Sequence, residues 1–139
     1  MMNKKCIFCK IANGDIPSAK IYEDDSFIAF LDLGPASMGH TLIVPKEHFQ
    51  DLCTLDNEIT AKVLGVAAKI GRAMLKGLGC AGFNIVQNNG EAAGQTVMHF
   101  HIHVIPRYKD GAKMVAWSSG TLTEKEKENT VTCIRSCLE

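Results

Sequence analysis

The 139-residue sequence has no surplus of charge of either sign, because 15 lysines and arginines balance 15 aspartates and glutamates. A chain without net positive charge has no bulk attraction for nucleic acid or for an anionic membrane surface. The sequence also lacks a run of about 18 apolar residues, the length that a membrane-spanning helix requires. We therefore expect neither nucleic acid nor a membrane as a partner, and any phosphate ligand must be held by local geometry.

The apolar core of a secretory signal is missing as well, because the basic start at residues 1–5 is soon followed by Lys10, Asn13 and Asp15. Six cysteines would suggest a disulfide framework in a short secreted chain. The missing signal and the 46% of hydrophobic residues argue against that framework. We expect a reduced, cytoplasmic protein that folds as a single domain over residues 1–139.

Short segments rich in β-branched and aromatic residues, bounded by Gly, Pro or Asp, predict strands. They lie at residues 27–31, 41–44, 83–87 and 98–105. Between the second and the third, apolar residues recur at helical spacing over about residues 58–76 and predict a long amphipathic helix, which Asp56 caps. Gly65 and Gly71 inside this helix indicate either close packing on the sheet or, equally, a kink.

A capping box at residues 123–126 begins a second predicted helix, in which Val131, Ile134 and Leu138 share one face. Strands grouped around one long helix, without regular alternation of strand and helix, favour an α+β fold over a doubly wound one. We expect an antiparallel sheet of about five strands with one long helix and one C-terminal helix.

Three histidines, His99, His101 and His103, alternate with apolar residues in the last predicted strand. Because side chains alternate across a strand, the histidines are expected on one face. The alternate residues are expected to point toward the long helix, and they are Met98, Phe100, Ile102 and Val104. A lone histidine would be an ordinary half-exposed residue, but three in strict alternation indicate a site. At about 3.3 Å per residue, the outer two lie roughly 13 Å apart, too far to ligate one metal unless the strand bends.

The pattern His-apolar-His-apolar-His-apolar-apolar resembles the signature of the histidine triad (HIT) family of nucleotide-binding proteins, and in particular its Hint branch. Residues 24–32, 39–48 and 88–96 resemble further family motifs in the family's order. The resemblance covers roughly residues 6–107 and leaves residues 108–139 as a tail. It implies a HIT-like fold, a homodimer and a purine nucleotide substrate, such as a phosphoramidate, a dinucleoside polyphosphate or a related adenylate. It also implies hydrolysis or nucleotidyl transfer through a covalent nucleotidyl-histidine.

The resemblance assigns catalytic roles to four histidines. His101 matches the central nucleophile, which needs a neutral ring nitrogen aimed at the phosphorus atom. His103 matches the residue that contacts the phosphate and assists proton transfer at the leaving group. His40 matches a histidine that supports the site from a neighbouring strand, and His99 is the first histidine of the triad.

The resemblance also implies where the nucleoside binds. Asp32 matches the aspartate that accepts hydrogen bonds from the ribose hydroxyls. Phe27, Ile28 and Leu33 would form an apolar slot for the base, although the strand pattern makes plain core an equal alternative for Phe27 and Ile28.

A loop rich in glycine and alanine precedes the histidines and is the expected phosphate-binding segment. Gly94, Gln95 and Thr96 would present backbone N–H groups and side chains to phosphate oxygens, and glycine would allow close approach. Asn88 is placed beside them by the resemblance. Composition alone would equally predict a flexible turn here.

Cys6 and Cys9 have the two-residue spacing that lets both thiolates reach one zinc ion. Two unrelated buried thiols are an alternative, and a redox motif is another, although no thioredoxin-like strand and helix surround the pair. Triad proteins with the same cysteine pair complete their zinc site with two histidines, which correspond here to His48 and His99. Four protein ligands would make a closed, structural site that does not activate water.

Two other functions remain open on the sequence. A zinc hydrolase would hold a catalytic metal on two histidines of the last strand together with His40 or His48, although no glutamate is placed as its base. A signalling module would bind the nucleotide without turning it over, which the intact triad disfavours.

Overall fold

The computed structural model describes residues 3–112 and 118–139, and its centre is an antiparallel sheet of five strands in the order β1-β2-β3-β5-β4. The strands are β1 (Lys20–Glu23), β2 (Phe27–Leu31), β3 (Thr41–Pro45), β4 (Gly82–Val86) and β5 (Ile102–Arg107). Three α-helices accompany them in the described residues: α1 (Ile7–Ala12), α2 (Asn57–Gly77) and α3 (Glu124–Ser136). Two short 3-10 helices, η1 (Leu52–Thr54) and η2 (Glu91–Ala93), lie in the connecting segments. The expected α+β fold, with its long and its C-terminal helix, is confirmed.

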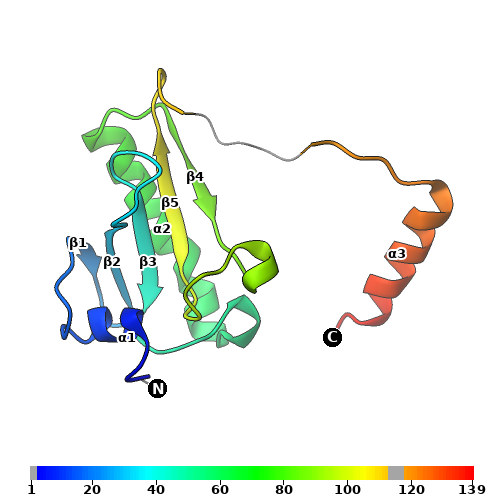
Figure 1. The fold of residues 1–139 in the computed structure, drawn as a ribbon, viewed down its shortest axis with the longest axis horizontal. Coiled ribbons are helices and arrows are strands. Elements are labelled where there is room, and N and C mark those ends of the chain that lie inside the picture. Colours follow the sequence, from blue (N-terminus) through cyan, green and yellow to red (C-terminus); the bar gives the residue numbers. More distant parts are fainter. Residues whose placement is uncertain (1–2, 113–117) are drawn as a thin grey trace.

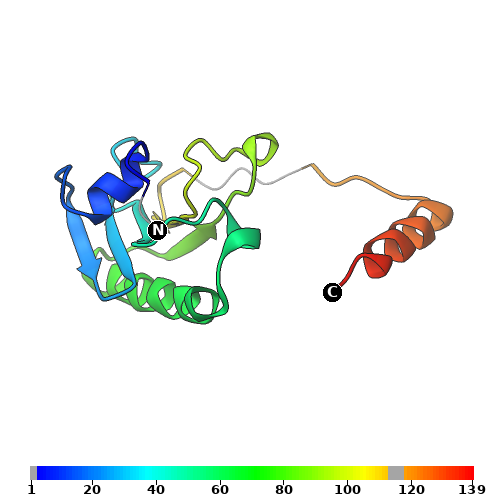
Figure 2. The ribbon, with the colours of Figure 1, turned by 90° about the horizontal axis from the view of Figure 1, so that it is seen from below.

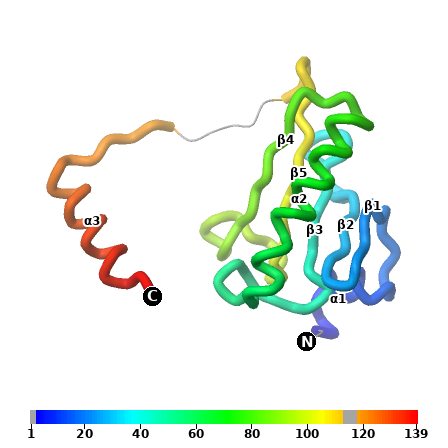
Figure 3. Tube along the Cα trace, turned by 180° about the vertical axis from the view of Figure 1, so that it is seen from behind, coloured from blue at the N-terminus to red at the C-terminus, as the bar shows by residue number. Residues whose placement is uncertain are grey.

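The helices α1 and α2 lie on opposite faces of the sheet, while α3 lies apart from it (Figures 1 and 2). Figure 3 shows α2 crossing the back of the sheet along its length. In the described ranges, 3–112 and 118–139, no helix has the length and apolar character needed to cross a membrane.

The long helix α2 begins and packs as its sequence predicts. Asp56 caps it by accepting a hydrogen bond from the backbone N–H of Ile59 at 2.8 Å. A Cβ atom on Gly71 would come within 2.3 Å of the Phe83 ring, so only glycine lets β4 approach the helix this closely. Close packing is therefore confirmed at Gly71, but not at Gly65, where a Cβ atom would meet nothing within 4 Å.

Alternation along the strands divides the core into two clusters. Phe27 and Ala29 of β2 pack with Ile102 and Val104 of β5 against α2. On the other face of the sheet a second cluster forms beneath α1, and it comprises Phe8, Ile11, Ile28, Phe30, Leu42 and Val44. The long helix α2 thus covers one face of the sheet, while the short helix α1 covers only part of the other.

The last strand is shorter than predicted, because β5 begins at Ile102 instead of residue 98. Its neighbours explain the late start, since β4 pairs with β5 only as far as His103 and β3 only as far as Ile102. Upstream, the Phe100 N–H donates to the carbonyl of Phe49, outside the sheet. Alternation nevertheless persists, because Phe100 joins the cluster beneath α2. Met98 does not join it, contrary to the prediction.

The sequence also left two short elements unpredicted, α1 and β1. At the other end of the chain, Thr123 caps α3 with the predicted box, in which its hydroxyl accepts from the Glu126 N–H. The helix ends at Ser136, so Leu138 lies just beyond it and not within it.

Candidate functional site

A cavity of about 290 Å³ lies on the α1 face of the sheet. Its apolar wall comes mainly from α1, β2 and the loops beside them: Ile7, Phe8, Ile11, Ile16, Phe30, Leu33, Leu42 and Val97. Its polar lining includes Asp32, Thr96, His101 and His103. The cavity therefore joins an apolar slot to a cluster of imidazoles and a carboxylate.

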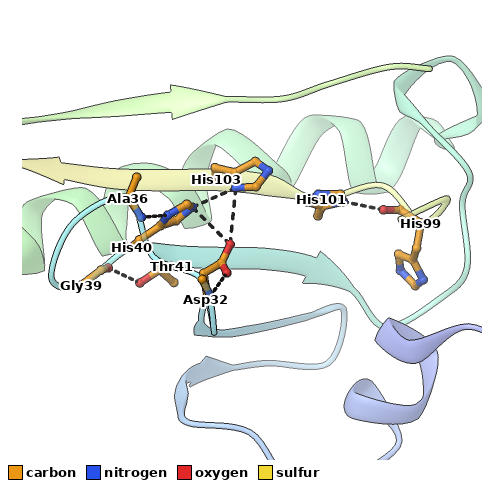
Figure 4. A network of polar contacts seen from close by, with 9 residues as sticks. Asp32, Ala36, Gly39, His40, Thr41, His99, His101 and His103 are labelled. Carbon is orange, nitrogen blue, oxygen red and sulfur yellow. Dashed lines mark hydrogen bonds and ion pairs between the residues drawn. The ribbon is translucent and has the colours of Figure 1, made fainter. Parts of the chain in front are cut away.

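His101 is buried at this cavity with one ring nitrogen committed. Its Nδ1 lies 2.7 Å from the backbone carbonyl oxygen of His99, so Nδ1 carries the proton and donates it there (Figure 4). The opposite nitrogen, Nε2, consequently keeps its lone pair. Burial lowers the pKa of His101, which favours this neutral form. A neutral imidazole with a fixed tautomer has the form that a nucleophile requires.

His40 and His103 are coupled by a short hydrogen bond between their rings. The backbone N–H of Ala36 donates to His40 Nδ1 at 3.0 Å, so neutral His40 carries its proton on Nε2. That Nε2–H lies 2.9 Å from Nδ1 of His103 and donates to it (Figure 4). His103 therefore bears its own proton on Nε2. One backbone amide fixes the tautomers of two rings.

The pKa of His103 falls to about 4, first because the ring is buried and then because charge on His101 or His40 would repel its positive form. The Asp32 carboxylate offsets this only in part. The pKa of His40 is also lowered by burial. Near neutral pH, both rings are thus neutral hydrogen-bond donors at Nε2.

Asp32 follows β2 and lies beside the two coupled histidines. Its Oδ1 accepts the Gly34 N–H at 2.8 Å, and its Oδ2 lies 3.5 Å from His40 Nε2 and 4.0 Å from His103 Nδ1. These three side chains are near enough to hold a metal ion by distance alone. However, His40 already uses Nδ1 to accept from Ala36, so the Nε2 that faces the cluster is protonated and offers no lone pair. The protonation state disfavours a catalytic metal here.

Three of the predicted nucleotide-binding residues line the cavity: Asp32, Leu33 and Thr96. Phe27 does not, because it lies on the α2 face of the sheet with no exposed surface. Ile28 faces the α1 side but is 1% exposed and lines a different depression. The expected place of these two in the apolar slot is corrected, and Phe8 and Phe30 occupy it instead. Alternation along β2 is the signal that separates Phe27 from Phe30.

The loop before the histidines is organised by Gln95, which is 3% exposed. Its Oε1 accepts from the Gly90 N–H, and its Nε2 donates to the carbonyls of Gln50 and Val97. Both ends of the side chain are thus occupied by backbone, so Gln95 holds the loop and is not free for a phosphate. Asn88 packs beside Gly94, and neither lines the cavity.

A second cluster gathers two thiols and two imidazoles from three distant segments of the chain. Cys9 Sγ lies 3.3 Å from His48 Nδ1 and 3.5 Å from His99 Nδ1, and Cys6 Sγ lies 3.4 Å from His99 Nδ1. The two Nδ1 atoms are 3.2 Å apart. A tetrahedral zinc ion with ordinary bond lengths separates its ligand atoms by about 3.4–3.8 Å. The four predicted ligands therefore lie together at a spacing that fits one metal ion.

The hydrogen bonds around this cluster also suit a metal. His99 Nε2 lies 2.9 Å from the Pro45 carbonyl and donates to it, which leaves Nδ1 with a lone pair facing the thiols. Burial lowers the pKa of His99 to about 4, so this lone pair stays free of protons. Burial raises the pKa of Cys9, although the Asn3 N–H donates to its sulfur at 3.3 Å. A bound cation would stabilise the buried thiolate and so offset the effect of burial on its pKa.

Two curated relatives carry enzyme names. Adenylylsulfatase HINT3 of Arabidopsis thaliana is 38% identical over 140 residues, which cover 96% of this chain and 70% of that protein. An adenosine 5'-monophosphoramidase of Schizosaccharomyces pombe is 40% identical over 122 residues, which cover 87% of this chain and 89% of that protein.

Solved structures share the fold over nearly the whole chain. A HIT family protein from Bacillus anthracis is 41% identical with a TM-score of 0.89, and the match covers 98% of this chain and 99% of that one. A zinc-bound histidine triad family protein from Mycobacterium smegmatis is 36% identical with a TM-score of 0.74, covering 96% and 97% of the two chains. Residues 13–110, well over half of this chain, match the HIT domain. The chain therefore belongs to the HIT domain family.

Proposed function

We propose that this enzyme hydrolyses a purine nucleotide, or transfers its nucleotidyl group, through a covalent intermediate on His101. The observation that carries the proposal is the tautomer of His101, whose Nδ1–H is held by the His99 carbonyl while Nε2 keeps its lone pair at the cavity. The names of the two enzyme relatives support a nucleotide substrate with a phosphoramidate or sulfate leaving group.

In the proposed reaction, His101 Nε2 attacks the phosphorus atom that bears the nucleoside. The bond from phosphorus to the leaving group breaks, and the leaving group departs with that electron pair and takes up a proton. Water then attacks the nucleotidyl-histidine, which releases the nucleotide and restores neutral His101. Two moderate displacements replace one difficult displacement.

The neighbouring side chains receive roles that follow from their protons. His103 donates its Nε2–H to a phosphate oxygen or to the leaving group, and His40 positions it through the ring-to-ring hydrogen bond. Asp32 accepts from the ribose hydroxyls, because it is the carboxylate at the mouth of the apolar slot. Phe8, Phe30 and Leu33 face the base.

We also propose that Cys6, Cys9, His48 and His99 hold a zinc ion, which ties the N-terminal segment to the segment that follows β3 and to the one that leads into β5. Four protein ligands leave no open position, so the ion supplies stability and not an activated water. The zinc-bound Mycobacterium smegmatis relative supports zinc as the metal. Thiolate ligands suit a reducing compartment such as the cytoplasm.

A homodimer is the third part of the proposal. The strand β4 is an edge of the sheet, and Ile85 on it is 43% exposed. On α2, Leu64 is 63% exposed. An apolar patch at an unpaired edge favours pairing with a second copy about a two-fold axis.

The nucleophile is tested by trapping the intermediate with a radiolabelled adenosine phosphoramidate. In His101→Ala, turnover is expected to fall by about 10³-fold or more, while nucleotide affinity stays within about tenfold, because the binding groups lie elsewhere. The His103→Gln variant is the matched control, since it is slower but still accumulates label on the protein. Label on His101→Ala protein, or substantial turnover by it, would contradict the assignment.

A further inference from the structure

The C-terminal helix α3 is well capped, and among the described residues it stands apart from the sheet and its helices. It is 13 residues long, and Figures 1 and 3 show it standing clear of the sheet. Isolated helices shorter than about 12–15 residues are marginal in water. Val131 and Ile134 share one face of α3 and are 50% and 58% exposed. A docking surface for that face would account for both the helix and its apolar side chains.

A groove of about 520 Å³ lies on the α2 face of the sheet, near the edge formed by β1. It is mostly apolar, and its lining includes Ile21 of β1, Ala73 of α2, and Met38 and Leu78 from the adjoining loops. Ile21 is 49% exposed and Met38 is 77% exposed. The groove thus offers an apolar surface against which the apolar face of α3 can pack.

The charges at the two surfaces are also complementary. Lys69 lines the groove, and its Nζ lies 5.1 Å from the centroid of the Tyr22 ring, which fixes a positive charge at the rim. On α3, Glu124 pairs with Lys127 at 2.7 Å, and Glu128 lies three residues before Val131 on the same side of the helix. A helix seated by Val131 and Ile134 brings Glu128 toward that basic rim.

The direction of the chain favours a groove on another molecule. In Figures 1 and 3, α3 lies beyond β4, whereas β1 lies at the opposite end of the sheet. Ile21 of β1 lines the groove, so the groove lies at that end as well. A second copy that joins at β4 would occupy the space on the α3 side of the sheet and carry its own β1 edge outward. The crystal structure of the Bacillus anthracis relative superposes on this chain with a TM-score of 0.89, and the match covers 98% of this chain, which includes most of α3.

We propose that two copies of this chain exchange their C-terminal helices, so that α3 of each seats Val131 and Ile134 in the groove between α2 and β1 of the other. The proposal rests on the second copy proposed above and is independent of the nucleotide chemistry. Helix exchange would give the C-terminal tail a role in assembly, separate from the catalytic residues.

The test places a photoreactive benzoylphenylalanine at Ala73, an exposed groove residue of α2. Unlabelled Ala73 variant is mixed with an excess of nitrogen-15-labelled full-length chain, left to exchange subunits and irradiated. Mass spectrometry then identifies the tryptic peptide 128–135, which contains both apolar residues of α3. We expect cross-links to the heavy form of this peptide, because it comes from the other copy.

Two variants of the labelled chain provide a matched comparison. Ile134→Glu puts a charge into the contact and is expected to lower the cross-link yield by about tenfold or more. Thr132→Glu puts the same charge on another face of α3 and is expected to leave the yield unchanged. Cross-links to the light peptide alone mean that α3 folds onto its own groove and overturn the proposal.

Absence of cross-links to residues 124–139 also overturns the proposal, as does a monomer in sedimentation at micromolar concentration. Label trapped on His101 in the same preparation reports the chemistry separately. Failure of helix exchange is thereby distinguishable from failure of the proposed function.

Discussion

Hydrogen bonds to backbone groups determine what each histidine of this site can do. The Ala36 N–H fixes the proton of His40, the His99 carbonyl fixes that of His101, and the Pro45 carbonyl fixes that of His99. In the proposed function, identical residue types are thereby divided into a donor, a nucleophile and a metal ligand. Chemical role at this scale follows from hydrogen bonding and not from residue identity.

Replacing His40 should change the pH dependence as well as the rate. In His40→Ala, His103 loses the donor to its Nδ1, and we expect kcat to fall by about 10-fold to 100-fold, as when other supporting partners are lost. Protonated His40 would repel positive charge on His103, so its removal raises the pKa of His103 from about 4, with His101 and Asp32 still facing the ring. Because the neutral form is the active one, the acid limb of the pH–rate profile should move to higher pH.

The conservative variant His40→Gln keeps a side-chain N–H and should restore part of the rate and of the acid limb. A merely structural role for His40 would lower the amount of folded protein without moving the limb. The profile of kcat against pH, measured for wild type and both variants, separates these outcomes. An unmoved limb in His40→Ala would reject the positioning role.

Strand alternation in the sequence predicts which face the histidines share but not which protons they carry. His99, His101 and Phe100 are placed correctly because adjacent residues in an extended chain face opposite sides, even before β5 begins. The tautomers depend on carbonyl and amide groups that only the folded chain brings near. The place of Phe8 in the cavity was not predicted, because α1 is too short to show a periodic pattern.

At the scale of whole elements, long periodic segments were predictable and short ones were not. The helix α2 exceeds its predicted span by only one residue at each end, because its apolar stripe repeats over 21 residues. The strand β1 has 4 residues with one half-buried side chain, so it carries almost no alternation. Its position is fixed by pairing with β2, which is a tertiary property.

The edge strand β4 gives a direct test of the proposed dimer. Ile85→Lys places a charge on the exposed apolar patch of that strand and should convert the dimer to a monomer at micromolar concentration, because burying an unpaired charge is costly. Leu52→Lys is the control, since Leu52 is 45% exposed and lies outside the sheet. Sedimentation velocity on both variants decides the matter. An unchanged dimer in Ile85→Lys would exclude this edge as the interface.

For the whole molecule, the Cys6, Cys9, His48 and His99 cluster joins the start of α1 to segments about 40 and 90 residues later. A link between such distant segments constrains the chain strongly, because it closes long loops. The same four residues lie beside the cavity, since Phe8 of α1 contacts the rings of both His99 and His101. Loss of the metal is therefore expected to loosen the wall of the site without removing any group that reacts.

Replacing Cys6 and Cys9 together by alanine should release one equivalent of zinc and lower the melting temperature on the order of 10 °C, because an ion that binds only the folded state stabilises it. Cys53→Ala, at an exposed thiol outside the cluster, should change neither value. Single-turnover rates per folded molecule should persist in the double variant, since His101 is not a ligand. Metal analysis, calorimetry and rapid-quench assays measure the three quantities.

If zinc stays bound without the two thiols, the ligand set is wrong. If the rate instead falls in proportion to zinc while the fold is intact, the metal takes part in the chemistry, and His101 loses its role as the sole origin of turnover.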